Sequence, residues 1–239
     1  LGFISGWINV VAGGGSLINI LAMLFMGISG TTANGTNRIA VFFQNLAALG
    51  TFWRSGFIVF KTCFILSFYT SLGAVVGAFF GTKLDAVWFD RFLAFILIIV
   101  FFVIWGKQKG MKGKKIQSSL ARAPRFQGYF LLMLAGFWGG IIQVGVGFIL
   151  IPILHYTFRL NLVVTNAYKT FIVLIYTVLA LIIFAGSNKI NWHIGIAIAS
   201  GALVGGWWGA KAAIKLNAKW IYHFIYLSLI VTISKLLFF

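Results

Sequence analysis

Long apolar stretches separated by short polar ones fill almost the whole chain. Most of them are close to the about 20 residues that an α-helix needs to cross the hydrocarbon core of a bilayer. The eight apolar segments cover residues 2–28, 33–53, 57–81, 86–105, 127–157, 162–186, 191–211 and 218–238. This pattern predicts an all-α polytopic membrane protein.

A polar, basic stretch at residues 106–126 divides these segments into two groups of four. It carries seven lysines and arginines and no acidic residue. Short loops rich in Lys and Arg stay on the cytoplasmic side of helical membrane proteins. We therefore expect a first repeat at residues 1–105, a basic cytoplasmic linker at 106–126 and a second repeat at 127–239.

Both groups contain the same glycine motif. Residues 73–83 read GAVVGAFFGTK, and residues 201–211, which lie 128 positions further on, read GALVGGWWGAK. Glycines four residues apart lie on one face of a helix and let another backbone approach closely. The motif predicts close helix packing in each half, and its recurrence indicates an internal duplication.

The first segment of each half is long for a single crossing, and glycines interrupt it near its centre. They are Gly13, Gly14 and Gly15 in the first half and Gly145 and Gly147 in the second. Two geometries fit. Each segment is a broken, tilted helix that crosses the membrane, which makes the halves parallel, or it is a re-entrant hairpin that returns to its own side, which inverts them.

Loop charges distinguish the two geometries. The parallel arrangement places Lys211, Lys215 and Lys219 outside, against the positive-inside rule, and the inverted arrangement places them inside. The loop charges therefore favour inverted repeats.

Polar side chains gather directly after each glycine-broken segment. Residues 34–38 read NGTNR and residues 166–170, at an offset of 132, read NAYKT, so each half supplies an Asn and a cation at nearly the same place. Polar groups inside hydrocarbon are costly and therefore mark functional sites. The candidate substrate-binding residues are Asn34, Gly35, Thr36, Asn37, Arg38, Asn166, Tyr168, Lys169 and Thr170, together with Gly13, Gly14, Gly15, Gly145, Gly147 and Gln143.

The chemistry of these clusters favours an anion. A helix start offers unpaired N–H groups and the positive end of the helix dipole. Arg38 adds a planar fork suited to oxyanions and Lys169 adds a point charge. The alternative is that both cations only reach toward the interface; their repetition and the lack of a nearby acid argue against it.

Composition supports the membrane class and excludes others. The 239 residues are 61% hydrophobic and only 9% charged, with a formal charge of +17. Soluble proteins carry about 25% charged residues. The positive charge belongs mainly to loops that face lipid headgroups, so we expect no nucleic-acid partner. The single cysteine and the scattered histidines offer no metal site, and we expect neither a cofactor nor an enzyme activity.

The ordered motifs resemble those of the sulfite exporter TauE/SafE family. They are AGGGS at 12–16, ANGTNR at 33–38, GFWGG at 136–140 and GVGFILIP at 145–152. The resemblance implies export of small sulfur-containing anions such as sulfite or organosulfonates. The carried-over positions are Gly13, Gly14, Gly15, Gly35, Thr36, Asn37, Gly145, Gly147 and Pro152. Tyr168 and Lys169 depart from the small polar residues usual there.

The resulting hypothesis is a multi-pass exporter of a small anion in the inner cell membrane. The only acids, Asp85 and Asp90, flank a loop, so no intramembrane carboxylate is available for a proton relay or a sodium site. We therefore predict export driven by the membrane potential. The alternatives are a transporter or channel for another solute, and a non-transporting membrane subunit. The expected partners are the anion and the bilayer, with a homo-oligomer left open.

Overall fold

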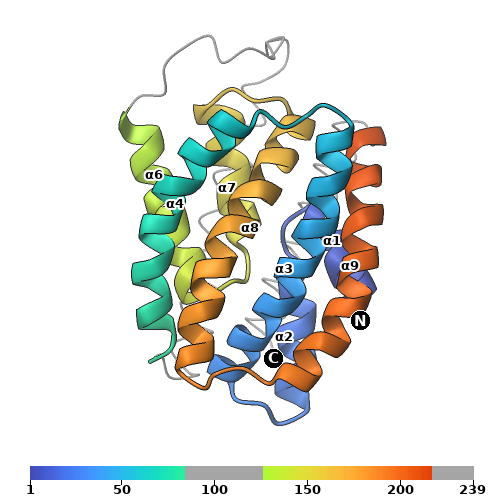
Figure 1. Cartoon of the computed structure of the whole chain (residues 1–239), viewed down its shortest axis with the longest axis vertical. Helices are drawn as coiled ribbons and strands as arrows, with labels where there is room; N and C mark the ends of the chain where they lie inside the picture. Colours follow the sequence, from blue (N-terminus) through green and yellow to red (C-terminus); the bar gives the residue numbers. More distant parts are fainter. Residues whose placement is uncertain (84–125, 217–239) are drawn as a thin grey trace, which may run out of the picture.

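A computed structural model describes residues 1–83 and 126–216, which form a bundle of helices without a strand in those ranges (Figure 1). The predicted segments 86–105 and 218–238, and the linker 106–126 up to its last residue, lie outside the described residues. The helices are α1 (Gly2–Val11), α2 (Ser16–Phe25), α3 (Gly30–Arg54), α4 (Phe60–Gly81), α6 (Phe126–Ile141), α7 (Val146–Pro152), the π-helical turn η1 (Ile153–Thr157), α8 (Leu162–Gly186) and α9 (Trp192–Lys215).

The first segment of each half is broken at its glycines. The break between α1 and α2 contains Gly13 with φ +100°, and the break between α6 and α7 contains Gly145 with φ +75°. Glycine adopts such positive φ values without the steric cost that a Cβ atom imposes. With 10 residues each, α1 and α2 are about 15 Å long, half the thickness of the hydrocarbon core.

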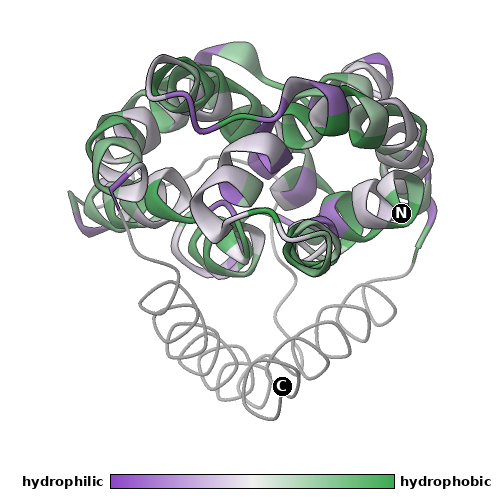
Figure 2. Ribbon diagram, turned by 90° about the horizontal axis from the view of Figure 1, so that it is seen from below, coloured by the Kyte–Doolittle hydropathy of each residue, from purple (hydrophilic) through white to green (hydrophobic). Residues whose placement is uncertain are grey.

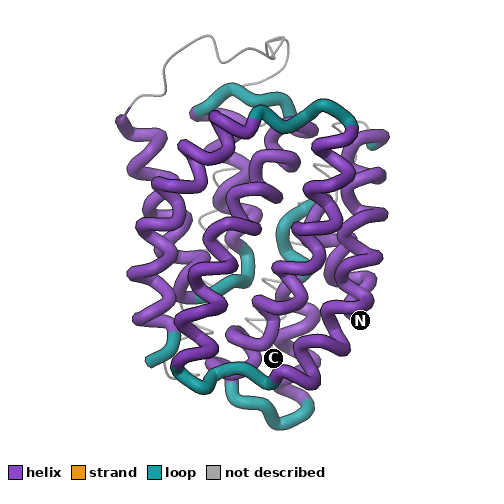
Figure 3. The backbone as a smooth tube through the Cα atoms, viewed as in Figure 1, coloured by secondary structure: helices purple, strands orange, loops and turns teal. Residues whose placement is uncertain are grey.

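The chain turns back after the first break. Gly15 lies directly against the Ser5 carbonyl and the Asn9 amide of α1, so α2 begins by returning alongside α1. Figure 3 shows a loop at each break, deep inside the bundle, with α2 and α7 running back toward the side from which α1 and α6 came. The breaks are therefore reversals of chain direction within the bundle.

The two glycine motifs pack against the first helix of the opposite half. Gly73 and Gly77 of α4 lie against the carbonyl oxygens of Met133 and Phe137 of α6, and Gly205 of α9 lies against that of Phe3 of α1. A Cβ atom at Gly77 or Gly205 would come within 2.0 and 2.1 Å of these oxygens. Both copies thus allow a backbone approach that a larger residue would prevent, as the motif predicts.

These contacts also fix the helix directions. Gly2 meets Ile198 and Gly209 meets Trp7, so α1 and α9 run in the same direction. Gly35, near the start of α3, meets the Lys189 carbonyl beyond the end of α8, so α3 and α8 run in opposite directions. Helices α1, α3 and α9 point one way, and α4, α6 and α8 point the other (Figure 1). Helix α6 thus runs opposite to α1, α8 opposite to α3, and α9 opposite to α4.

The described helices expose many large apolar side chains. Among the described helices, α4 and α8 are long and apolar enough to cross a membrane by length and composition. Large side chains such as Phe64, Phe68 and Trp208 are more than half exposed. Figure 2 looks along the bundle and shows hydrophilic positions on helices in its middle. Apolar outside and polar inside is the distribution expected of a protein solvated by lipid.

Candidate anion site at the two helix breaks

The carboxyl-terminal end of α6 lies inside the bundle and is capped from α3. A helix leaves its last carbonyl groups without partners in its own ladder. Arg38 donates from Nη1 to the Gly139 carbonyl at 3.2 Å and from Nη2 to the Gly140 carbonyl. Asn34 donates from Nδ2 to the Ile141 carbonyl at 2.7 Å. The Asn and the cation of the first half thus complete the broken helix of the second half.

Gln143, in the break that follows α6, extends this network. Its Oε1 accepts from Arg38 Nη1 at 3.0 Å, its backbone N–H donates to Asn34 Oδ1 at 3.1 Å, and its Nε2 donates to the Tyr176 hydroxyl at 3.1 Å. The Arg38 guanidinium carbon lies 4.4 Å from the centre of the Phe184 ring. Arg38 itself has no exposed surface. The guanidinium is therefore buried and held in one orientation from three sides.

The end of α1 is capped in the same way from α8. Lys169 Nζ donates to the carbonyl groups of Asn9 at 3.1 Å and Val10 at 2.8 Å, and to Asn166 Oδ1 at 3.0 Å. Asn166 Nδ2 donates to the Val11 carbonyl at 3.4 Å. All three hydrogens of the ammonium group have acceptors. Lys169 can therefore act on a nearby anion through its charge, and has no hydrogen bond left to offer without rearrangement.

These two caps replace the acidic partners that buried cations normally have. The described part of the chain contains no Asp or Glu. A helix carries about half a negative charge at its carboxyl end. Arg38 and Lys169, 0% and 2% exposed, each face such an end and bring a full positive charge to it. An excess of positive charge therefore remains at both breaks.

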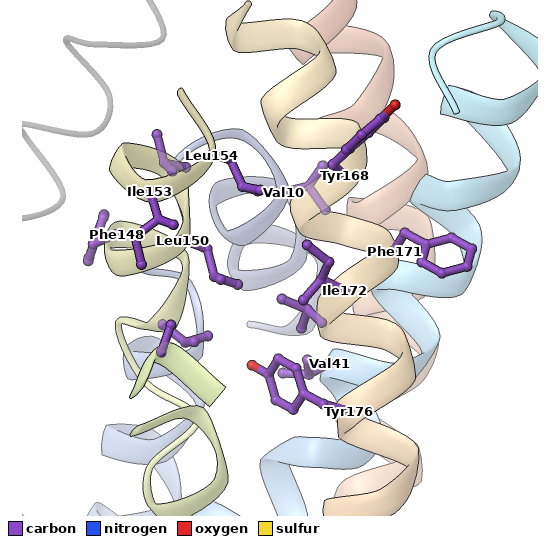
Figure 4. Packing of buried hydrophobic residues seen from close by; sticks show 14 of the residues in the cluster. Val10, Val41, Phe148, Leu150, Ile153, Leu154, Tyr168, Phe171, Ile172 and Tyr176 are labelled. Carbon is purple, nitrogen blue, oxygen red and sulfur yellow. The ribbon is translucent and has the colours of Figure 1, made fainter. Parts of the chain in front are cut away.

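The breaks meet at their glycines. A Cβ atom at Gly147 would lie 2.5 Å from the Gly13 Cα, so the two backbones touch where side chains would keep them apart. Gly14 lies against the Phe148 ring. In Figure 4, the Tyr176 hydroxyl points from α8 toward the broken segment of the second half. We call the contact between the two breaks, at Gly13 and Gly147, the junction.

Several buried polar atoms on α3 and α8 have no hydrogen-bond partner among the described residues. On α3 these are Asn37 Nδ2, Arg38 Nε and Gln44 Nε2, and on α8 the hydroxyls of Thr170 and Thr177. Unpaired polar groups in an apolar interior cost free energy unless a ligand or water satisfies them. Their presence on the two capping helices marks these helices as the polar lining of the bundle.

Three of the predicted residues serve other contacts. The Thr36 hydroxyl accepts a hydrogen bond from the Asn191 backbone at 2.9 Å, and Gly35 lies against the Lys189 carbonyl, so both hold the connection between α8 and α9. Tyr168 points toward Thr62 of α4, away from the junction (Figure 4). The structure does not bring these three residues together with Arg38 and Lys169.

Two residues of the Arg38 network were not predicted from the sequence. Phe184 gives no signal, because one Phe among 26 in an apolar chain is ordinary. Tyr176 does give one. It lies 132 positions after Gln44, the same offset that relates Asn34 to Asn166, and it is a polar residue within an apolar run. Applying the offset to every polar position would have found it.

A cavity of about 620 Å³ lies elsewhere, between α4 and α8. Its lining consists of Phe64, Ile65, Ser67, Phe68, Tyr69, Ser71, Ile175 and Leu179. Phe64 and Phe68 belong to the exposed apolar surface, and none of the predicted site residues lines the cavity. It is a feature of the outer face and not part of the junction.

Two broken helical segments that touch at their glycines inside an apolar helical bundle are typical of a class of protein, the polytopic membrane transporters with discontinuous helices. The chain belongs to the sulfite exporter TauE/SafE family, because the sequence model of that family matches residues 1–236. The resemblance seen in the glycine and NGTNR motifs is thereby confirmed.

Curated relatives agree with the transporter class. The chain is 27% identical to a probable membrane transporter protein, ORF9, of Sinorhizobium sp, over 91% of this chain and 82% of the relative. It is 24% identical to a probable membrane transporter protein of Haemophilus influenzae, over 88% and 82%. It is 23% identical to the probable membrane transporter protein YunE of Bacillus subtilis, over 92% and 89%. No solved structure is significantly similar to the chain. The protein is a membrane transporter.

Proposed function

We propose that this transporter exports a small sulfur-containing anion, sulfite or an organosulfonate, and binds it at the junction of the two helix breaks. The observation that carries the proposal is the pair of buried cations, Arg38 and Lys169, that cap the helix ends leading into the two breaks. The family description supports the sulfur oxyanion as the cargo.

The charge balance at the junction supports an anion. The two capped helix ends carry about half a negative charge each, and the two cations exceed them by about one positive charge. Helix α2 begins in the first break and has no side-chain cap. The positive end of its dipole therefore adds to the positive potential there. An anion entering from water therefore finds compensation for the hydration that it loses.

Hydrogen-bond donors for the anion are available on one helix. Asn37 Nδ2 and Gln44 Nε2 are seven residues apart, two turns on the same face of α3, and Arg38 keeps its Nε–H unpaired. Oxyanions of sulfur accept several hydrogen bonds at once, as phosphates and carboxylates do. Asn37 and Arg38 are thus proposed to contact the anion, while Lys169 holds it by charge.

We further propose that the two halves are inverted repeats and that the broken segments are re-entrant. The opposite directions of α3 and α8 support this, as do the reversals at the breaks. The orientation follows from the loop cations. Those at the end shared by the carboxyl terminus of α3 and the amino terminus of α8 are Arg54, Lys61, Arg159, Lys211 and Lys215, against Lys83 and Lys189 at the other end. The former end is proposed to be cytoplasmic.

The membrane potential is the proposed driving force. The described helices contain no carboxylate that could relay a proton, and an inside-negative potential favours anion exit by about 2.3 kcal/mol per charge per 100 mV. The transporter is therefore proposed to act as a facilitator in the inner cell membrane, with a homo-oligomer left open and no cofactor.

Flux measurements in proteoliposomes test the proposal. Purified protein is reconstituted with radiolabelled sulfite, taurine-like sulfonate or chloride, and the voltage is clamped with a potassium gradient and valinomycin. We expect saturable sulfite or sulfonate flux that follows the voltage and needs no pH gradient. Flux that is absent without a pH gradient would refute the driving force, and equal flux of chloride would refute the selectivity.

A further inference from the structure

The surroundings of Lys169 Nζ have the composition of a monovalent-cation site. Three oxygen atoms surround the ammonium nitrogen, the carbonyl oxygens of Asn9 and Val10 and the side-chain oxygen of Asn166, at 3.1, 2.8 and 3.0 Å. Neutral carbonyl and amide oxygens at the carboxyl end of an unwound helix are the ligands with which transporters hold a coupling Na⁺. In this chain a tethered cation occupies that place.

We propose that Lys169 fills a latent site for a monovalent cation and so replaces a coupling ion with a permanently bound one. An ammonium group and K⁺ have nearly the same size and charge, so oxygens placed around one also suit the other. The site would then take K⁺ from solution once the lysine side chain is removed. Its consequence for transport rests on the proposed function, but the site itself does not.

The second capped end differs in shape and provides a matched control. Arg38 reaches its acceptors from two nitrogens, Nη1 toward Gly139 and Gln143 and Nη2 toward Gly140, and stacks on Phe184. These oxygens are spread along a planar group and do not surround one point. A spherical ion cannot contact all of them, so removing Arg38 should not create a K⁺ site.

The test compares the thermal stability of Lys169→Ala, Arg38→Ala and wild-type protein in detergent. Each is measured in potassium chloride, sodium chloride and N-methyl-D-glucamine chloride at equal ionic strength. With K⁺ near 100 times its dissociation constant, we expect the Tm of Lys169→Ala to rise by about 5 to 10 °C over the bulky organic cation. The Tm of wild type and of Arg38→Ala should be the same in all three salts.

A second variant separates the cation effect from lost packing. Lys169→Met keeps the length of the side chain without its charge and fills the position of Nζ, so its Tm should respond to K⁺ by less than half as much. Equal Tm values of Lys169→Ala in all salts would overturn the proposal. Failure of Lys169→Ala to fold even in K⁺ would overturn it as well, because a bound K⁺ should supply the missing charge.

A transport arm distinguishes this inference from the proposed function. In liposomes at clamped voltage, sulfite flux by wild type should be the same in K⁺ and in the organic cation, and flux by Lys169→Ala should become K⁺-dependent. A wild type that transports no sulfite refutes the proposed function and leaves the Tm comparison to decide on the site. Wild-type flux that requires Na⁺ or K⁺ overturns the replacement of a coupling ion.

Discussion

The ends of α1 and α6 are both capped by a buried cation, but the two cations differ in the hydrogen bonds that they can still donate. At the end of α1, the Lys169 ammonium spends all three hydrogens on Asn9, Val10 and Asn166. At the end of α6, Arg38 caps two carbonyls, bonds Gln143 and still keeps its Nε–H free of any partner in the described structure. The junction therefore has one side that only supplies charge and one side that can also donate to a ligand.

The conservative exchange Arg38→Lys should have the largest effect on transport. A lysine can keep the charge and cap the α6 carbonyls, but it loses the planar fork and the spare N–H. Hydrogen bonds to a charged group contribute about 1.5 to 3 kcal/mol, so we expect sulfite flux at low concentration to fall about 100-fold. Flux is measured in proteoliposomes beside the Tm. Near-normal flux would mean that Arg38, like Lys169, acts through charge alone.

The substitution Gly147→Ala should affect both sides of the junction together. Its Cβ would lie 2.5 Å from the Gly13 Cα, so the two breaks must separate. We expect flux at least about 10-fold lower and a stability loss of about 1 to 3 kcal/mol. The matched control is Gly50→Ala, where nothing lies within 4 Å of the added atom. Equal flux in both variants would show that contact between the breaks is dispensable.

A pair of variants tests whether the scaffold around the two ends is equivalent. Gly77→Ala and Gly205→Ala place a Cβ at 2.0 and 2.1 Å from a carbonyl oxygen of the opposite half. Each should lower stability by about 1 to 3 kcal/mol, and the two losses should agree within about 1 kcal/mol. Thermal unfolding followed by tryptophan fluorescence gives both values. A loss at one site alone would contradict equivalent packing of the two motifs.

The smallest expected effect comes from Tyr176→Phe, which touches only the Arg38 side. It removes the hydroxyl that accepts from Gln143 and should cost about 1 kcal/mol, or about 2 to 4 °C in Tm. In the Arg38→Lys background this cost should change, because the residues share one network, and in the Lys169→Ala background it should simply add. Additivity in both backgrounds would argue that Gln143 does not connect Tyr176 to Arg38.

Much of this arrangement follows from the sequence because its physical causes are local. Apolar runs of membrane length, and glycines that allow a positive φ, predicted the helices and the breaks at Gly13 and Gly145. The offset of 132 related Asn34 to Asn166 and placed a cation beside each. Family membership was also recognisable from these motifs.

The direction in which the cations point could not be predicted, because it depends on contacts between distant segments. The sequence suggested that Arg38 and Lys169 face an anion directly, and the structure shows them on carbonyl groups 101 to 160 residues away. Tyr168, adjacent to Lys169, faces α4 because successive residues of a helix point about 100° apart. Thr36 was expected in the site and instead holds Asn191. The sequence motif shows which residues are polar, but the packing of distant helices determines which of them are in contact.

The reciprocal capping also bears on how the protein is made. The α1 carbonyl groups of Asn9, Val10 and Val11 are completed by Lys169 and Asn166, which leave the ribosome more than 150 residues later. Until then, none of the earlier residues that the structure describes caps these three carbonyl groups, and uncapped carbonyls are unstable in hydrocarbon. We therefore expect α1 to stay near the membrane surface or in the insertion machinery until α8 has been synthesised and can cap it.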